Sequence, residues 1–209
     1  MAAERYRCVQ LNNYMMIPPY LYKGFTEKIH AIEFLEKGKF RLGLLECYKT
    51  IEDNNRRDES EGQSVSIVKK YLPDHTLQLK GKHINPLYLF CASGPKVDLD
   101  YMKTKWPFIV KINDPKMLKN SINENKPLNT KVEIGKCKIE KVRYTKGEVV
   151  DIDPNSIEAV KLCYTQKPRS YVKDCEIRYI VTASPPINYE PDMYLDYNLG
   201  HEIDYASFA

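Results

Sequence analysis

A short strand followed by a helix is the first clear pattern of apolar and polar positions. Residues 20–25 (YLYKGF) are typical of a strand, and Thr26 is the expected N-cap of the helix. Gly38 is its expected stop, because glycine tolerates the left-handed conformation that ends many helices. The predicted buried face has apolar residues at helical spacing: Ile29, Ile32 and Leu35.

Further strands follow from alternating or continuous apolar runs, namely 40–48, 64–72, 76–80, 86–93, 106–112, 130–144 and 176–183. The continuous run 86–93 (PLYLFCAS) predicts a central, buried strand, whereas 130–144 fits one long strand or a hairpin. Short helices are expected after Asp114-Pro115 and near 156–163. Helices do not alternate with strands. The sequence therefore predicts an α+β fold of mixed, mostly antiparallel sheets with two or three short helices.

Composition describes an ordinary protein of the cytoplasm. The 209 residues are 43% hydrophobic and 29% charged, and no run reaches the length needed to cross a membrane. Six widely spaced cysteines without a CxxC pair indicate free thiols in a reducing compartment. Four histidines without ligand spacing give no sign of a metal site.

Charge is distributed unevenly along the chain. Residues 188–209 contain five acids, several tyrosines and no Lys or Arg, so a net charge of +4 for the whole chain leaves +9 for residues 1–187. A basic body suits an anionic partner such as a nucleic acid. We therefore expect one domain over 1–187 and an acidic tail over 188–209. The tail either masks the body, docks an antitoxin or chaperone protein, or is a disordered end or edge strand.

Four motifs lie where predicted strands end or in a charged loop. They are LYKG (21–24), EDNNRRDESEG (52–62), FCASG (90–94) and DCEIR (174–178). The chain contains no GxxxxGK[ST], GxGxxG or GxSxG sequence, so P-loop, dinucleotide-fold and serine-hydrolase chemistry lack support.

Three of these motifs carry a resemblance. LYKG is similar to the first signature of the ADP-ribosyltransferase superfamily, FCAS to the second, and DCE to the acid-x-Glu pair of the third. The order Lys167…Tyr171…Asp174…Glu176…Arg178 also resembles a widespread group of uncharacterised bacterial proteins. Toxin components of anti-phage systems that ADP-ribosylate nucleic acid look like the nearest functional relatives.

The resemblance implies an ADP-ribosyltransferase that uses NAD as co-substrate and no metal. Cleavage of the nicotinamide–ribose bond builds positive charge on the ribose, which a fixed carboxylate stabilises. Glu176 is the expected catalytic carboxylate, with Asp174 and Arg178 positioning the substrate. Gly24 is expected to admit the nicotinamide amide because it has no side chain. The residues expected to bind NAD are Tyr22, Lys23, Gly24, Arg41, Arg57 and Ser93.

Other interpretations of the same residues stay open. Glu176 and Arg178 also fit a solvated ion pair on the face of a strand. The protein would then be a non-catalytic module that binds nucleic acid or another protein. A third alternative is an NAD glycohydrolase, in which water is the acceptor.

Overall fold

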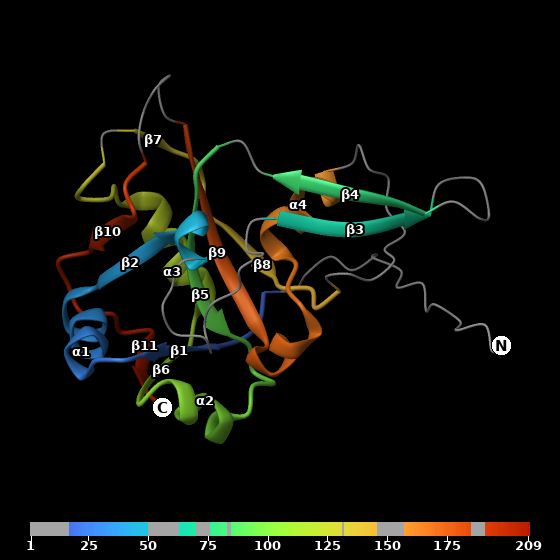
Figure 1. The fold of residues 1–209 in the computed structure, drawn as a ribbon. Helices are drawn as coiled ribbons and strands as arrows, with labels where there is room; N and C mark the ends of the chain where they lie inside the picture. The colour runs from blue at the N-terminus through green and yellow to red at the C-terminus, as the bar shows by residue number, and fades with distance from the viewer. Residues whose placement is uncertain are drawn as a thin grey trace.

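The computed structural model describes residues 17–49, 63–69, 76–82, 85–130, 132–145, 157–184 and 191–209. They form a mixed α+β fold around a curled antiparallel sheet (Figure 1). This confirms the predicted mixture of elements and the mostly antiparallel pairing. The elements in chain order are β1 (Leu21–Phe25), α1 (Lys28–Lys37), β2 (Lys39–Leu44), η1 (Leu45–Lys49), β3 (Gln63–Lys69), β4 (Thr76–Lys82), β5 (Leu87–Ser93), α2 (Leu99–Lys105), β6 (Phe108–Ile112), α3 (Pro115–Glu124), β7 (Glu133–Ile134), β8 (Lys138–Lys141), α4 (Ile157–Thr165), η2 (Arg169–Asp174), β9 (Glu176–Ser184), β10 (Tyr194–Asn198) and β11 (Ala206–Phe208).

The main sheet is centred on β5, as its apolar run predicts. Its order is β10-β2-β5-β1-β6-β11, and β9 pairs with β5 along the whole length of that strand. Because β9 occupies one edge of β5, strands β2 and β1 must share the other edge. Strand β2 pairs with Tyr88 and Leu89, whereas β1 pairs only with Ser93. The two strands therefore diverge, and the edge of β5 between them pairs with neither.

Aromatic side chains fill much of the core beneath this sheet. Phe34 of α1 stacks on Phe90 of β5 with ring centroids 6.0 Å apart, and Phe40 stacks on Tyr197 at 5.1 Å. The Tyr179 ring meets Phe90 edge-on at 5.7 Å. These contacts join α1, β2, β5, β9 and β10 in one cluster, so the central strand is held rigidly from the core side.

Helix α1 ends as predicted but begins and packs differently. Gly38 has φ 62° and caps the helix in the left-handed conformation. The N-cap is Glu27 rather than Thr26, and its side chain makes no capping hydrogen bond. Ala31 and Phe34 are the fully buried residues and Leu35 packs against the same core, whereas Ile29 is 56% exposed, so the predicted buried face was wrong at Ile29.

Helix α3 agrees with the prediction in detail. The Asp114 carboxylate accepts hydrogen bonds from the backbone N–H groups of Lys116 and Met117, and Pro115 occupies the first turn. Helix α2 was not predicted; its N-cap, Asp98, accepts bonds from two backbone N–H groups in the same way. None of the described helices is long and apolar enough to cross a lipid bilayer.

Two further segments differ from the sequence prediction. Residues 130–144 form neither one strand nor a hairpin, because β7 and β8 each pair separately with β9. Strand β9 is not the last strand, because the acidic tail follows one of its predicted alternatives, an edge strand: β10 pairs with β2, and β11 pairs with β6. The described part of the acidic segment, residues 191–209, thus supplies strands to both ends of the sheet order.

Strands β3 and β4 were both predicted as strands, and they pair antiparallel in a separate two-stranded sheet. This small sheet lies beside α4 and extends away from the main sheet (Figure 1). The predicted charged loop at 52–62, with Arg56 and Arg57, lies outside the described residues.

Candidate functional site

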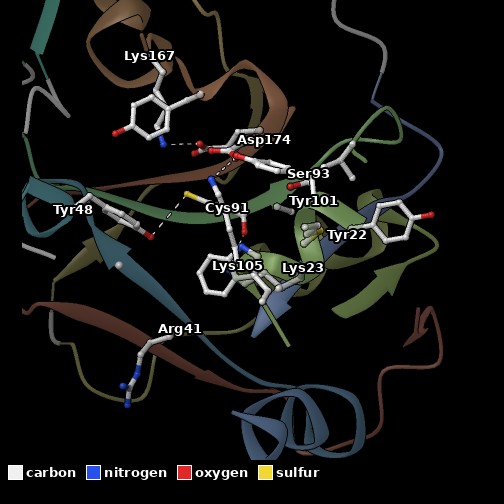
Figure 2. A pocket seen from close by; sticks show the side chains of 18 of the residues that line it. Tyr22, Lys23, Arg41, Tyr48, Cys91, Ser93, Tyr101, Lys105, Lys167 and Asp174 are labelled. Carbon is white, nitrogen blue, oxygen red and sulfur yellow. Dashed lines mark hydrogen bonds and ion pairs between the residues drawn. The ribbon is translucent and has the colours of Figure 1, made fainter. Parts of the chain in front are cut away.

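A pocket of about 410 Å³ opens beside the stretch of β5 where β1 and β2 diverge (Figure 2). Its volume falls in the range of small-molecule sites. Strands β1, β2 and β5 line it, together with α2 and its end, the segment 167–176, and Met193 with Tyr194. Elements far apart in the sequence therefore meet there because the sheet splits at that point.

Most residues that the sequence analysis selected lie on this pocket. The lining includes Tyr22, Lys23, Gly24, Arg41, Ser93, Asp174 and Glu176. Arg178 lies behind Glu176, 1% exposed. Arg57 is outside the described residues.

Strand register brings three of the motifs together. Tyr22 on β1 pairs with Ser93 on β5, and Ser93 pairs in turn with Glu176 on β9. Tyr22 of LYKG, the serine at the end of FCAS and the glutamate of DCE therefore occupy one row across three adjacent strands, with Lys23 and Gly24 next to Tyr22 on β1.

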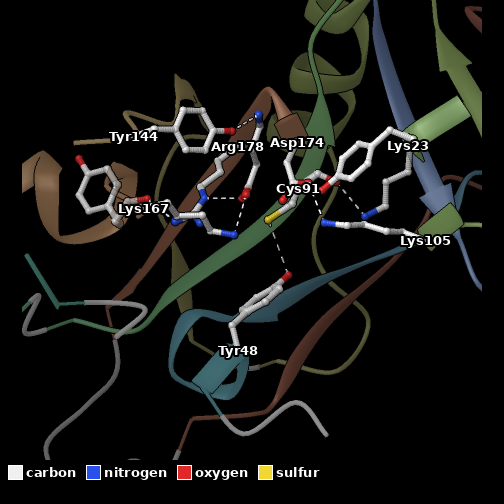
Figure 3. Close-up of polar contacts among 11 residues, drawn as sticks. Lys23, Tyr48, Cys91, Lys105, Tyr144, Lys167, Asp174 and Arg178 are labelled. Atoms are coloured by element: carbon white, nitrogen blue, oxygen red, sulfur yellow. Dashed lines mark hydrogen bonds and ion pairs between the residues drawn. The ribbon is translucent and has the colours of Figure 1, made fainter. Parts of the chain in front are cut away.

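Glu176 is held on both carboxylate oxygens (Figure 3). The Arg178 Nε donates to Oε1 at 2.7 Å, and the Lys167 Nζ lies 2.7 Å from Oε2. The backbone N–H of Glu176 donates to the Tyr144 hydroxyl at 2.6 Å. The glutamate is only 6% exposed, so the predicted alternative of a solvated ion pair is wrong: the pair exists but is buried.

Electrostatics keep this carboxylate ionised. Burial alone raises the pKa of Glu176, but the charges of Arg178 and Lys167 and the hydrogen bonds they donate outweigh it. The pKa of the carboxyl therefore lies well below its usual range. An ionised carboxylate facing a pocket can stabilise positive charge that develops on a ligand.

Lys23 donates a hydrogen bond to β5 where that strand lacks a partner strand on this edge. Its Nζ donates to the Cys91 carbonyl at 2.8 Å, within the stretch of β5 that pairs with neither β1 nor β2, and lies 4.5 Å from the centre of the Phe90 ring. Burial lowers the pKa of Lys23, although the Cys91 and Glu176 groups act to raise it. Lys23 therefore has a structural partner as well as a place on the pocket wall.

Gly24 lies against an indole ring. A Cβ added at Gly24 would come within 2.2 Å of the Trp106 Cγ. The sequence analysis expected the missing side chain to leave room for a ligand; here Trp106 takes that room. Trp106 follows α2 directly and itself lines the pocket.

Asp174 is anchored to α2 at the pocket wall (Figure 3). Its carboxylate accepts from the Tyr101 hydroxyl at 2.9 Å and from the Lys105 Nζ at 2.8 Å. Cys175 separates it from Glu176 with φ 46°, the one positive φ of a non-glycine residue in the described part of the chain. This turn ends η2 and starts β9, so Asp174 and Glu176 bind different partners.

Arg41 lies apart from the charged side chains of Lys167 and Asp174, as Figure 2 shows. Its Nε donates to Asp196 at 2.5 Å, and its guanidinium lies 4.9 Å from the Tyr194 ring centre. The side chain is 62% exposed, so it forms part of the rim rather than of the pocket floor.

Several lining residues were missed by the sequence analysis as site residues. Lys167 was noted only as part of a motif, although it contacts Glu176 directly. Tyr101, Lys105 and Trp106 were missed because α2 itself was not predicted. Tyr48 and Cys91 lie in contact on the pocket wall, where the Cys91 Sγ donates to the Tyr48 hydroxyl at 3.9 Å. Burial, the largest influence, raises the pKa of the Cys91 thiol to about 12.

Neither a metal-binding group nor a known relative indicates what the pocket does. Within the described ranges, no group of three or more His, Cys, Asp or Glu side chains is placed to hold a metal ion. No protein-family model matches the chain, and no curated protein or solved structure matches it either.

Proposed function

We propose that the protein is an NAD-dependent ADP-ribosyltransferase in which Glu176 is the catalytic carboxylate. The observation that carries the proposal is the convergence of three separate motifs on one pocket. Lys23-Gly24, Ser93 and Glu176 come from β1, β5 and β9, and all four residues line it. Tyr22, which directly precedes Lys23-Gly24, pairs with Ser93, and Ser93 pairs with Glu176, so the strand register brings the three motifs together.

The chemistry fits the charges of the pocket. When the bond between nicotinamide and ribose breaks, its electron pair leaves with nicotinamide and C1′ becomes positive. The ionised carboxylate of Glu176 stabilises that charge until a nucleophile attacks C1′ and releases its proton to solvent water. Four cationic side chains line the pocket against the carboxylates of Asp174 and Glu176, namely Lys23, Arg41, Lys105 and Lys167, and this excess of positive charge favours an anionic co-substrate.

A nucleic acid is the acceptor that we propose, in the role of a bacterial toxin or anti-phage effector. The support is the net positive charge of the chain, +4 over all 209 residues, since the acidic residues 191–209 belong to the same sheet as the basic part. The test incubates the protein with NAD labelled on the adenylate part and with separate pools of RNA, DNA and protein. We expect nicotinamide release and transfer of label to RNA or DNA.

Glu176→Gln is the decisive variant, and we expect it to abolish both signals. Glu140→Gln is the matched control, since Glu140 is also an ion-paired glutamate of this sheet, with its Oε1 3.4 Å from the Lys161 Nζ, but does not line the pocket. Glu176→Asp keeps the charge but retracts the carboxylate, so it covers the case in which the glutamine variant does not fold. Label in free ADP-ribose alone would indicate a hydrolase. No nicotinamide release from wild-type protein would refute the enzyme proposal and leave a binding module.

A further inference from the structure

The carboxylate of Glu176 is held from two sides that differ in their relation to the pocket. Arg178 is 1% exposed, two residues along the same strand, and its Nη1 donates to the Tyr164 carbonyl at 2.6 Å. Lys167 lines the pocket itself and lies 2.7 Å from the other carboxylate oxygen. Arg178 therefore anchors the carboxylate from behind, and Lys167 fixes it on the side that a ligand enters.

The backbone places Lys167 firmly. Its N–H donates to the Arg143 carbonyl at 2.9 Å, in the segment that follows β8. The next residue of that segment, Tyr144, accepts the hydrogen bond from the Glu176 backbone at 2.6 Å. The Lys167 ammonium also lies 5.1 Å from the centre of the Tyr171 ring. The same short segment thus fixes both the main chain of the glutamate and the lysine that holds its side chain.

We propose that Lys167 is a positioning residue that orients the Glu176 carboxylate toward the reacting ribose. This inference rests on the proposed function. The lysine acts through Glu176: it fixes the plane of the carboxylate and balances its charge, so that the group needs no rearrangement when positive charge develops. A simple role in folding would require only that a cation be present somewhere near the glutamate, and Arg178 supplies that already.

The test compares Lys167→Met with Lys167→Arg, which keeps the positive charge. In Lys167→Met we expect kcat to fall about 100-fold with little change in KM, as for a misplaced catalytic group. The kcat of Lys167→Met should also fall at acid pH, as an acid limb of its pH profile. Burial raises the pKa of Glu176, and without Lys167 only Arg178 remains to lower it. Lys167→Arg should restore most of kcat and remove the acid limb. Lys105→Met, which removes the lysine paired with Asp174, should raise KM without adding an acid limb.

A second measurement does not depend on catalysis. The carboxyl carbon of Glu176, followed by NMR with ¹³C-labelled glutamate, should titrate at higher pH in Lys167→Met than in the wild type and in Lys167→Arg. Should Lys167→Met not fold, Lys167→Gln removes the charge and keeps a hydrogen-bond donor. An unshifted titration, or wild-type kcat with a flat pH profile, would overturn the positioning role. A shifted titration together with no NAD cleavage by any variant would instead overturn the proposed function and leave the electrostatic link standing.

Discussion

Gly24→Ala tests whether Trp106 packs against β1 as the structure places it. The added Cβ would lie 2.2 Å from the indole Cγ and 2.6 Å from its Cβ, and real Cβ contacts essentially never fall under 3.0 Å. The indole must therefore move by most of an ångström, away from its contacts with α2 and β1. Overpacking of this kind costs about 1–3 kcal/mol, and replacing glycine regains at most about 1 kcal/mol by restricting the unfolded chain.

The free energy of unfolding should therefore fall by about 1–2 kcal/mol. For an m-value of about 2 kcal/mol/M, this lowers the urea midpoint by roughly 0.5–1 M. Trp106 is the only tryptophan, so its emission should shift in the folded variant. Gly43→Ala is the matched control, since its Cβ would meet only the far end of the Tyr48 side chain at 3.1 Å. We expect it to change the midpoint little.

A double-mutant cycle decides the cause of the loss. Once Trp106→Gly has removed the whole side chain, including the Cβ and Cγ atoms that the new methyl group would meet, adding Gly24→Ala should cost almost nothing, as followed by circular dichroism. If Gly24→Ala costs the same with and without the indole, or nothing in either background, the close packing of the glycine and the ring is refuted.

Three more predictions concern stability. Because the pKa of Glu176 is lower in the folded than in the unfolded state, its contribution is fully present above the unfolded value of about 4.3 and is lost as the pH falls below it. Glu176→Gln should thus lower the free energy of unfolding, measured with urea at pH 7, by about 3 kcal/mol. If the difference between wild type and variant stayed constant down to pH 3, this reasoning would be contradicted. Cys175 has φ 46°, so Cys175→Gly should unfold at the same or a higher urea concentration than wild type. Cys175→Val should unfold at a lower urea concentration, with a free energy of unfolding reduced by about 1 kcal/mol or more. The reverse order would argue against the strained turn. Asp114→Ala should cost about 1 kcal/mol through loss of the α3 cap, measured by thermal unfolding, and Asp114→Asn should recover most of it.

Local signals predicted the fold well wherever they were strong. The continuous apolar run of β5 and the Asp-Pro start of α3 each fix an element without help from distant residues. The face of α1 was harder, because its buried stripe uses Ala31, which carries little hydrophobic signal, and leaves Ile29 exposed. Strand β10 has an alternating pattern too, with Leu195 and Tyr197 buried, but the acidic composition around it concealed that signal.

The site could be predicted only where motifs mark strand ends. Lys23, Ser93 and Glu176 were found because each motif has a recognisable local order. Trp106 was not found, since its contact with Gly24 depends on how α2 returns to β1. The burial of the Glu176 network could not be predicted either. Alternating charged residues give the same sequence pattern whether their face of the strand is exposed to solvent or covered by other elements.

The split at β5 connects the stability of the fold with the proposed chemistry. A strand edge that loses its neighbours leaves buried carbonyl groups without sheet partners, which is costly unless another donor reaches them. Lys23 supplies that donor to Cys91, and the same split makes space for the pocket that Glu176 and Lys167 face. Had β1 and β2 both stayed on β5, these carbonyls would be paired within the sheet and the pocket would be closed. The lysine at position 23 therefore makes an open site compatible with a stable sheet, whichever ligand the pocket receives.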